Sequence, residues 1–177
     1  IHFDNRTLGN YRETNHLSVS VENSSYAVKE IINNDQLTLD GEIAKASINY
    51  FRKLSDNLTL NVSLPIYSFS KGFLDNPIEQ WHDLFGLSDG SRVDLPKSQL
   101  NFEVLSGSNK VKINDSDIGI GDIQISTKLN FYSKNKSDLY FITSLEIPTG
   151  SKKKYFGNDE FDGLIALNLK NHLRDNL

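Results

Sequence analysis

The segment Ile118–Ile147 limits the fold most strongly, because it holds two long runs in which apolar and polar residues alternate. From Ile123 to Phe131, apolar residues or threonine occupy every second position, and polar residues lie between them. After a polar turn, the same alternation resumes at Leu139 and continues to the end of the segment. A period of two is typical of a β-strand with one apolar face, whereas a helix spaces its apolar residues by three and four. The segment therefore predicts a pair of adjacent strands.

The length of these two strands points toward a membrane. Strands of soluble sheets usually have about 5 to 6 residues, whereas a transmembrane β-strand needs roughly 9 to 11. The chain has no run near the roughly 20 apolar residues of a membrane helix. Its mean hydropathy of -0.43 does not conflict with a membrane barrel, because half of the residues in such strands face a polar interior.

The same alternation recurs along the chain and predicts an all-β fold. We expect an antiparallel up-and-down meander that forms part of a transmembrane β-barrel, with one short helix in a long loop. The six predicted spanning strands are 15–28, 37–52, 57–67, 118–132, 138–148 and 161–173. Short turns and longer loops alternate between them, as in bacterial outer-membrane barrels. Because those barrels have at least about 8 strands, we expect residues 1–177 to be a single barrel domain that is incomplete at its C-terminal end.

Two interruptions of the pattern predict local features. The apolar positions change parity inside the second strand, so we expect a bulge near Gly41, where one extra residue exchanges the two faces. Residues 68–117 form a loop insertion with a short helix at about 77–85 and a hairpin at about 98–114. Pro77 suits the first turn of that helix, where a backbone N–H has no helical partner.

Alternation alone is equally typical of a soluble antiparallel sandwich or of a ligand-binding barrel. A soluble periplasmic protein without a membrane role is therefore the alternative interpretation. Tyr50, Tyr67, Tyr132 and Tyr140 lie near the ends of predicted strands, where membrane barrels carry interfacial aromatic residues. Soluble sheets carry such residues too, so the two interpretations remain open at the level of pattern.

Three motifs occur in a fixed order along the chain. They are the run Trp-His-Asp-Leu-Phe-Gly-Leu at 81–87, Gly-x-Gly-Asp at 119–122, and Pro-Thr-Gly at 148–150. Together they resemble an uncharacterised family of bacterial, mostly proteobacterial, proteins of unknown function that are predicted to be outer-membrane β-barrels. The resemblance covers about Leu37 to Leu169, and members of that family are longer than this chain. It implies a bacterial outer-membrane location and a barrel architecture, and it implies no particular activity.

The long loop carries the candidates for ligand binding or for a plug, which are Trp81, His82, Asp83, Phe85 and Arg92. A histidine and an aspartate can act as a base and its orienting partner, but adjacent residues on a helix do not face each other. We therefore favour a structural role, in which Trp81 and Phe85 fix the helix at the barrel mouth or in its lumen. No Gly-x-Ser-x-Gly motif is present, and we expect no catalytic activity.

The polar positions of the predicted strands are candidates for the lumen of the barrel, and the apolar positions between them would face lipid. The lumen candidates are Lys45, Asn61, Gln124, Lys128, Asn130 and Glu146. With this arrangement, the expected function is a channel or an uptake pore for a small solute.

Asp115, Asp117 and Asp122 are the candidates for a metal site, because two glycines separate them as in a calcium loop. An EF-hand needs glycine at its sixth position and a carboxylate at its twelfth. Counted from Asp115, these positions hold Ile120 and Ser126. The match fails, so we expect no metal site there and assign the aspartates to the start of a strand.

Composition limits the partners. A net charge of -4 at pH 7 offers no basic field to nucleic acid, and the absence of cysteine excludes thiolate metal sites. We expect no cofactor. The expected partners are membrane lipid, a small solute, and lipopolysaccharide phosphates near Lys152–Lys154.

Overall fold

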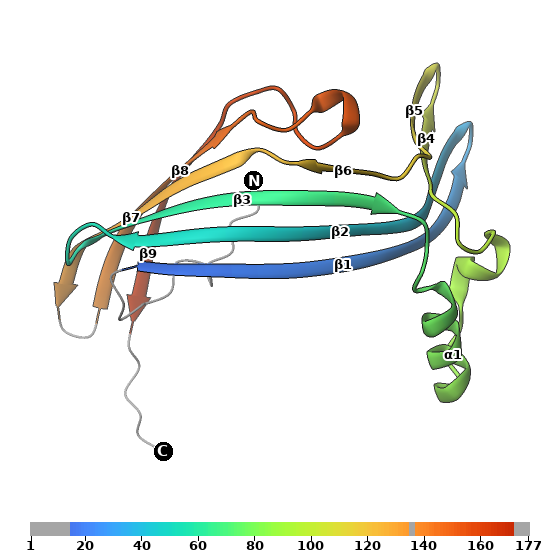
Figure 1. Cartoon of the computed structure of the whole chain (residues 1–177), viewed down its shortest axis with the longest axis horizontal. Coiled ribbons are helices and arrows are strands. Elements are labelled where there is room, and N and C mark those ends of the chain that lie inside the picture. Colours follow the sequence, from blue (N-terminus) through green and yellow to red (C-terminus); the bar gives the residue numbers. More distant parts are fainter. Residues whose placement is uncertain (1–14, 135–136, 172–177) are drawn as a thin grey trace. The chain divides into compact units, whose positions relative to one another are not determined.

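A computed structural model describes residues 15–134 and 137–171. In this part of the chain, nine strands form one sheet with antiparallel pairs, and one α-helix, α1 (Asp75–Phe85), interrupts them in sequence (Figure 1). The all-β, antiparallel prediction is confirmed. Within the same ranges, no helix has the length and hydrophobicity that crossing a membrane requires.

The strands are β1 (Asn15–Ile32), β2 (Asp35–Lys53), β3 (Leu58–Ser70), β4 (Asn101–Ser106), β5 (Asn109–Ile113), β6 (Asp117–Ile120), β7 (Ile123–Lys134), β8 (Ser137–Ile147) and β9 (Asp162–Asn171). Their order in the sheet is β5-β4-β2-β3-β7-β8-β9, with β1 also paired with β2 and β6 paired with β3. Two short 3-10 helices, Gly90–Asp94 and Lys152–Lys154, lie in the loops.

The predicted strand 118–132 is divided in the structure into β6 and β7. The break falls at Gly121 and Asp122, where the Asp122 carboxylate accepts a hydrogen bond from the N–H of Gly150 (2.8 Å). The local alternation did not reveal this break, because it depends on a loop far along the sequence. The turn residues at 135–136 and the end of the predicted strand 161–173 lie outside the described residues.

Two further boundaries of the long loop differ from prediction. Helix α1 begins at Asp75 rather than at residue 77, because the N–H of Leu74 finds an acceptor in the Glu42 carboxylate (2.6 Å). The predicted hairpin at 98–114 is β4 and β5, but it does not lie wholly in a loop. Its first strand joins the sheet by pairing with β2, from Gln36 opposite Leu105 to Asp40 opposite Asn101.

The residues group into two compact units, which we describe separately. Unit 1 comprises Ile1–Ser20, Ser47–Pro65 and Ile120–Leu177, and unit 2 comprises Val21–Ala46 and Ile66–Gly119. Strands β1, β2 and β3 each contribute residues to both units.

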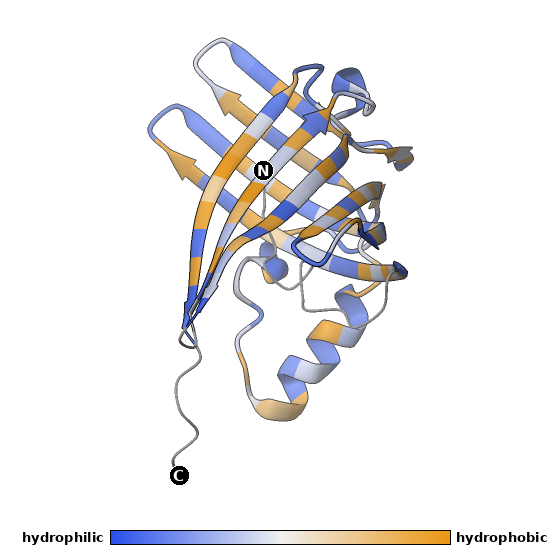
Figure 2. Cartoon of the chain, turned by 90° about the vertical axis from the view of Figure 1, so that its left-hand side faces the viewer, coloured by the Kyte–Doolittle hydropathy of each residue, from blue (hydrophilic) through white to orange (hydrophobic). Residues whose placement is uncertain are grey.

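In unit 1, the register places rows of polar side chains and the buried cluster of Phe51, Tyr140 and Ile142 on one face of the sheet. Mainly apolar side chains lie on the other face. Asn61 of β3 lies opposite Ser126 of β7, which lies opposite Ser144 of β8. These three residues are buried, with 4%, 1% and 6% exposure, and the hydroxyl groups of Ser126 and Ser144 are 2.9 Å apart. Figure 2 shows the alternation as bands of opposite hydropathy along the strands.

The opposite face of unit 1 is apolar, and it is the exposed one. Leu129 of β7 lies opposite Phe141 of β8, which lies opposite Leu167 of β9. Their exposures are 37%, 37% and 66%. A water-soluble sheet commonly shows the reverse order, with the apolar face covered and the polar face solvated.

The change of parity predicted in β2 is present. Buried positions of β2 are even-numbered up to Glu42 and odd-numbered from Ser47 onward, apart from Gly41 itself. Gly41 has a φ of 137°, a conformation that side chains rarely adopt, and an added Cβ would lie 2.7 Å from Leu100. The irregularity therefore requires glycine, as the predicted bulge does.

Unit 2 has a small core of buried apolar side chains, most of them aromatic. Phe69, Leu100 and Phe102 are buried, with 7%, 5% and 8% exposure. The ring of Phe102 meets Tyr26 and Phe69 edge-to-face, with centroids 5.8 and 6.3 Å apart. Such ring pairs stabilise a core beyond the area they bury.

Candidate functional site

A cluster of buried charged residues in unit 2 is the most unusual site in the described chain. Asp40, Glu42 and Asp75 are 3%, 0% and 5% exposed. Arg92 joins them, with a side chain that is 11% exposed. Charged residues are almost never fully buried unless they are paired, so the hydrogen bonds of each group decide what the cluster does.

Arg92 and Asp75 form the centre of the cluster. The guanidinium of Arg92 donates from Nη1 to Oδ1 of Asp75 (2.6 Å) and from Nη2 to the Ser25 hydroxyl (2.8 Å). The second oxygen of Asp75 accepts the N–H of Ser98 (2.9 Å). One ion pair therefore links β1, the start of α1 and the segment that follows the Gly90–Asp94 turn.

Glu42 forms the second anchor of the loop. Its Oε1 accepts a hydrogen bond from the N–H of Leu74 (2.6 Å), and its Oε2 accepts one from the side-chain NH2 group of Asn23 (3.2 Å). A carboxylate at a helix N-terminus also interacts favourably with the helix dipole. Glu42 thereby satisfies a free N–H of α1 and attaches the helix to β2.

Asp40 lies next to these two anchors and lines a small cavity of about 10 Å³. Asp75, Glu79, Arg92 and Lys97 line it as well, and a volume of this size holds about one water molecule. Burial raises the pKa of Asp40 to about 6, the Asp75 charge adds to the rise, and Arg92 opposes it. Asp40 therefore binds a proton at a higher pH than an ordinary aspartate does.

A change at Asp40 should alter the pH dependence of unit 2. The folded-state pKa is raised from 3.8 to about 6, so the contribution of Asp40 to stability is complete below pH 3.8 and is lost as pH rises through 6. We expect Asp40→Asn to be more stable than the parent protein above this range and to lose that advantage below it. Urea unfolding midpoints measured across the range test this. A pH profile of Asp40→Asn that matched the parent protein would contradict this role of Asp40.

The chemistry of this cluster is that of an anchor. The carboxylates of Asp75 and Glu42 are occupied by Arg92, by backbone N–H groups and by an amide, and the cavity beside Asp40 has room for about one water molecule. Among the described residues, no group of histidine, aspartate and glutamate side chains has the arrangement that a metal ion needs. Sequence reasoning missed Asp40, Glu42 and Asp75. The sequence offered one signal for this site, which is the pair of acidic residues Asp40 and Glu42 that flank Gly41 inside a predicted strand.

The predicted loop candidates lie on α1 and beyond it. The rings of Trp81 and Phe85 are 4.4 Å apart, but both side chains are more than half exposed within the described residues. Glu42 attaches the start of the helix to β2, and Arg92 attaches it to β1 through Asp75. The role of Trp81 and Phe85 at a barrel mouth or in a lumen stays a prediction. Arg92 itself is an anchor of the loop.

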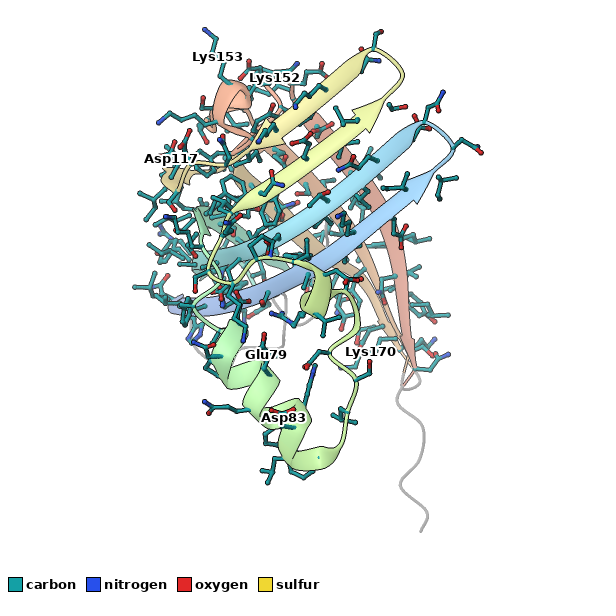
Figure 3. All side chains as sticks on the ribbon, turned by 90° about the vertical axis from the view of Figure 1, so that its right-hand side faces the viewer. Glu79, Asp83, Asp117, Lys152, Lys153 and Lys170 are labelled. Atoms are coloured by element: carbon teal, nitrogen blue, oxygen red, sulfur yellow. The ribbon has the colours of Figure 1, made fainter. Side chains whose placement is uncertain are left out.

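His82 has an acidic partner, but a different one from the neighbour considered in the sequence. Its Nδ1 lies 2.8 Å from Oδ1 of Asp89, and both side chains are about one-quarter exposed. Asp83 is exposed (Figure 3). This pair spans the end of α1, so it closes the helix onto the following turn.

The predicted lumen residues of unit 1 share its polar face. Gln124 lies opposite Glu146 and opposite Ser63, and the ammonium group of Lys128 lies 4.1 Å from the ring centroid of Tyr140. The side-chain oxygen atoms of Asn61 and Asn130 are buried without a hydrogen-bond partner among the described residues. In unit 2, Lys45 lies 5.9 Å from the ring of Tyr67.

A family model matches residues 18–177, and its description is "Protein of unknown function (DUF3187)". The chain belongs to this DUF3187 family. The match confirms the expectation of an uncharacterised family. No curated protein and no solved structure matches the DUF3187 chain.

Two of the predicted metal candidates of the DUF3187 chain, Asp117 and Asp122, accept hydrogen bonds from backbone N–H groups. The Asp117 carboxylate accepts its neighbour's N–H, from Ile118 (2.8 Å). Asp122 accepts the N–H groups of Gly150 (2.8 Å) and Asn158 (3.3 Å). Asp122 therefore holds together the two ends of the loop between β8 and β9.

Removal of the Asp122 carboxylate should loosen this loop. Asp122→Ala leaves the N–H groups of Gly150 and Asn158 without their acceptor, and a buried unsatisfied group costs about 1 to 3 kcal/mol. We expect faster hydrogen exchange at these two amides and faster proteolysis within 150–158. Asp117→Ala is the matched control, and an equal effect from it would contradict the role given to Asp122.

Proposed function

We propose that this chain supplies membrane-spanning strands of a β-barrel in the bacterial outer membrane. The apolar face of unit 1 would contact lipid, and the polar face would line a water-filled lumen through which a small solute passes. The observation that supports this most directly is the reversed burial of the two faces of unit 1. Transmembrane barrels have this arrangement, since their strands alternate between lipid and lumen.

The exposed apolar face is extensive. Its members from β7, β8 and β9 are between 37% and 76% exposed, and they are Leu129, Phe131, Phe141, Leu145, Ile165, Leu167 and Leu169. Soluble monomers rarely expose contiguous apolar patches larger than a few hundred Å². A soluble sandwich would need a second sheet over this face, and the described strands all belong to one sheet. Lipid is the cover that we propose instead.

The proposed span is limited to unit 1. Strands β7, β8 and β9 have 12, 11 and 10 residues, which is close to the roughly 9 to 11 of a tilted transmembrane strand. Strand β2 has 19 residues, more than a span requires. Its buried carboxylates Asp40 and Glu42 belong to unit 2 and lie outside the proposed span, where their desolvation by lipid does not arise.

The polar face of unit 1 fits a lumen. Its central row of Asn61, Ser126 and Ser144 offers hydroxyl and amide groups, and Lys128 and Glu146 add one charge of each sign. The side-chain oxygens of Asn61 and Asn130 lack partners among the described residues, and water in a lumen would satisfy them.

Site-directed spin labelling tests the proposal, and the absence of cysteine makes each single-cysteine variant unambiguous. Labels would be placed in turn at positions 165 to 169 of the full chain reconstituted into phosphatidylcholine bilayers. We expect odd-numbered labels to be relaxed preferentially by oxygen, which concentrates in lipid. Even-numbered labels should respond to a water-soluble nickel complex. Labels that respond equally to both agents, or a chain that stays in the aqueous phase, would reject the membrane function.

A further inference from the structure

The turn between β8 and β9 presents two unpaired cations at the end of the apolar face. Lys152, Lys153 and Lys154 form a 3-10 turn and are exposed, and Figure 3 shows Lys152 and Lys153 at its surface. Neither Lys152 nor Lys153 forms an ion pair with any described residue. Asp159 and Glu160 follow in the same loop, and within the described part of the chain they form no ion pair with either lysine.

Hydrogen bonds within the turn hold the backbone around these lysines in one conformation before any ligand binds. The Ser151 carbonyl accepts the N–H groups of Lys154 (3.1 Å) and Phe156 (3.0 Å), and Phe156 is only 5% exposed. Gly150 and Gly157 permit this closure, since an added Cβ would lie 2.5 Å from the Phe156 carbonyl oxygen or 2.6 Å from the Asp122 carboxylate. A preformed turn loses little conformational entropy when it binds a ligand.

The side chains next to the turn change from apolar to aromatic to cationic. A lipid monolayer changes in the same order, from acyl chains through the interface to the phosphate groups. Leu145 of β8 and Ile165 of β9 belong to the exposed apolar face, at 46% and 76% exposure. Phe161, which directly precedes β9, and Tyr155, which follows the lysines, are 69% and 49% exposed. Aromatic residues at the ends of an apolar band are typical of the membrane interface, and phosphate lies beyond that level.

From this sequence of apolar, aromatic and cationic side chains, we propose that Lys152 and Lys153 bind the phosphate groups of anionic lipids in the leaflet that borders the β8–β9 turn. This inference rests on the proposed membrane function. It names a ligand for one rim of the proposed barrel. The chemistry is charge-assisted hydrogen bonding between an ammonium group and a phosphate oxygen. Lysine near an anionic surface strengthens association by roughly fivefold for each charge that engages.

The test measures flotation of the full chain with two kinds of vesicle. One kind is pure phosphatidylcholine, and the other contains equal parts of phosphatidylcholine and phosphatidylglycerol. We expect at least a tenfold gain in partitioning on the anionic vesicles, and we expect Lys152→Gln/Lys153→Gln to lose most of it. Lys152→Arg/Lys153→Arg should keep the gain. Lys110→Gln/Lys112→Gln, which removes the same charge from β5, should keep it too.

The possible outcomes distinguish failure of the phosphate site from failure of the proposed membrane function. Flotation with both vesicles, but without a gain that depends on Lys152 and Lys153, would overturn the phosphate site and leave the membrane function standing. Failure to float with phosphatidylcholine would overturn the membrane function and the inference with it. Binding of inorganic phosphate that depends on Lys152 and Lys153, together with no gain on the anionic vesicles, would assign the lysines to free phosphate and would reject the lipid.

Discussion

Under the proposed membrane function, replacing Leu167 with arginine is expected to destabilise the protein in a bilayer by about 2 to 4 kcal/mol, because a cation near the centre of a bilayer has no water or counter-ion. Leu167 is 66% exposed and lies in the middle of β9 on the apolar face. The free energy of unfolding from phosphatidylcholine vesicles, measured by urea titration with circular dichroism, provides the value. Fractionation of expressing cells should also show less protein in the membrane.

The adjacent residue supplies the matched control. Asn168 pairs with Tyr140 on the polar face of unit 1, so Asn168→Arg adds the same charge on the side assigned to the lumen. We expect it to change stability by no more than about 1 kcal/mol, because water in the proposed lumen would solvate the added charge. If Asn168→Arg were the more harmful of the two, the faces would be assigned the wrong way round.

Arg92→Leu is expected to release the loop that carries α1. It leaves the Asp75 carboxylate buried without its cation, and loss of one partner from a buried ion pair costs about 3 to 5 kcal/mol. The N–H groups of Ser98 and Leu74, which bind the carboxylates of Asp75 and Glu42, report the opening. Their hydrogen exchange should accelerate by a factor on the order of 10² or more.

A double variant distinguishes two effects of Arg92→Leu, which are the uncompensated charge left on Asp75 and the loss of the contacts of the Arg92 side chain. Asp75→Asn removes the uncompensated charge, so Asp75→Asn/Arg92→Leu should exchange more slowly than Arg92→Leu alone. Additive effects of the two substitutions would mean that Asp75 and Arg92 are not energetically coupled. The exchange of β8 amides in unit 1 serves as an internal reference, because none of the hydrogen bonds of this ion pair involves that unit.

The sequence predicts the strands of unit 1 well because each has one polar and one apolar face. From Ile123 to Leu129, every second residue of β7 is apolar or threonine, and the observed register keeps these residues on one face. The same reasoning could not find the break at Asp122, since its cause is a hydrogen bond to Gly150. A period of two carries no information about contacts so distant in the chain.

The candidate site was harder to predict than the fold for a similar reason. Glu42 and Asp75 look like ordinary polar residues in the sequence, and only the folded chain makes Glu42 an acceptor for the start of α1. The loop was recognised as a functional candidate, but its aromatic residues Trp81 and Phe85 drew the interpretation away from its acidic anchors. Patterns of hydrophobicity identify faces, whereas buried ion pairs depend on which residues the fold brings together.

The change of parity in β2 has a consequence for how this gene can vary over time. Up to Glu42 the even positions are covered, and from Ser47 the odd positions are covered. A substitution between these points alters one side chain, whereas an in-frame deletion of a single codon there would turn every later side chain of the strand to the other face. We expect natural variants to accept amino-acid changes between residues 43 and 46 while keeping the number of codons constant, and to vary freely in length at the turn after Lys53.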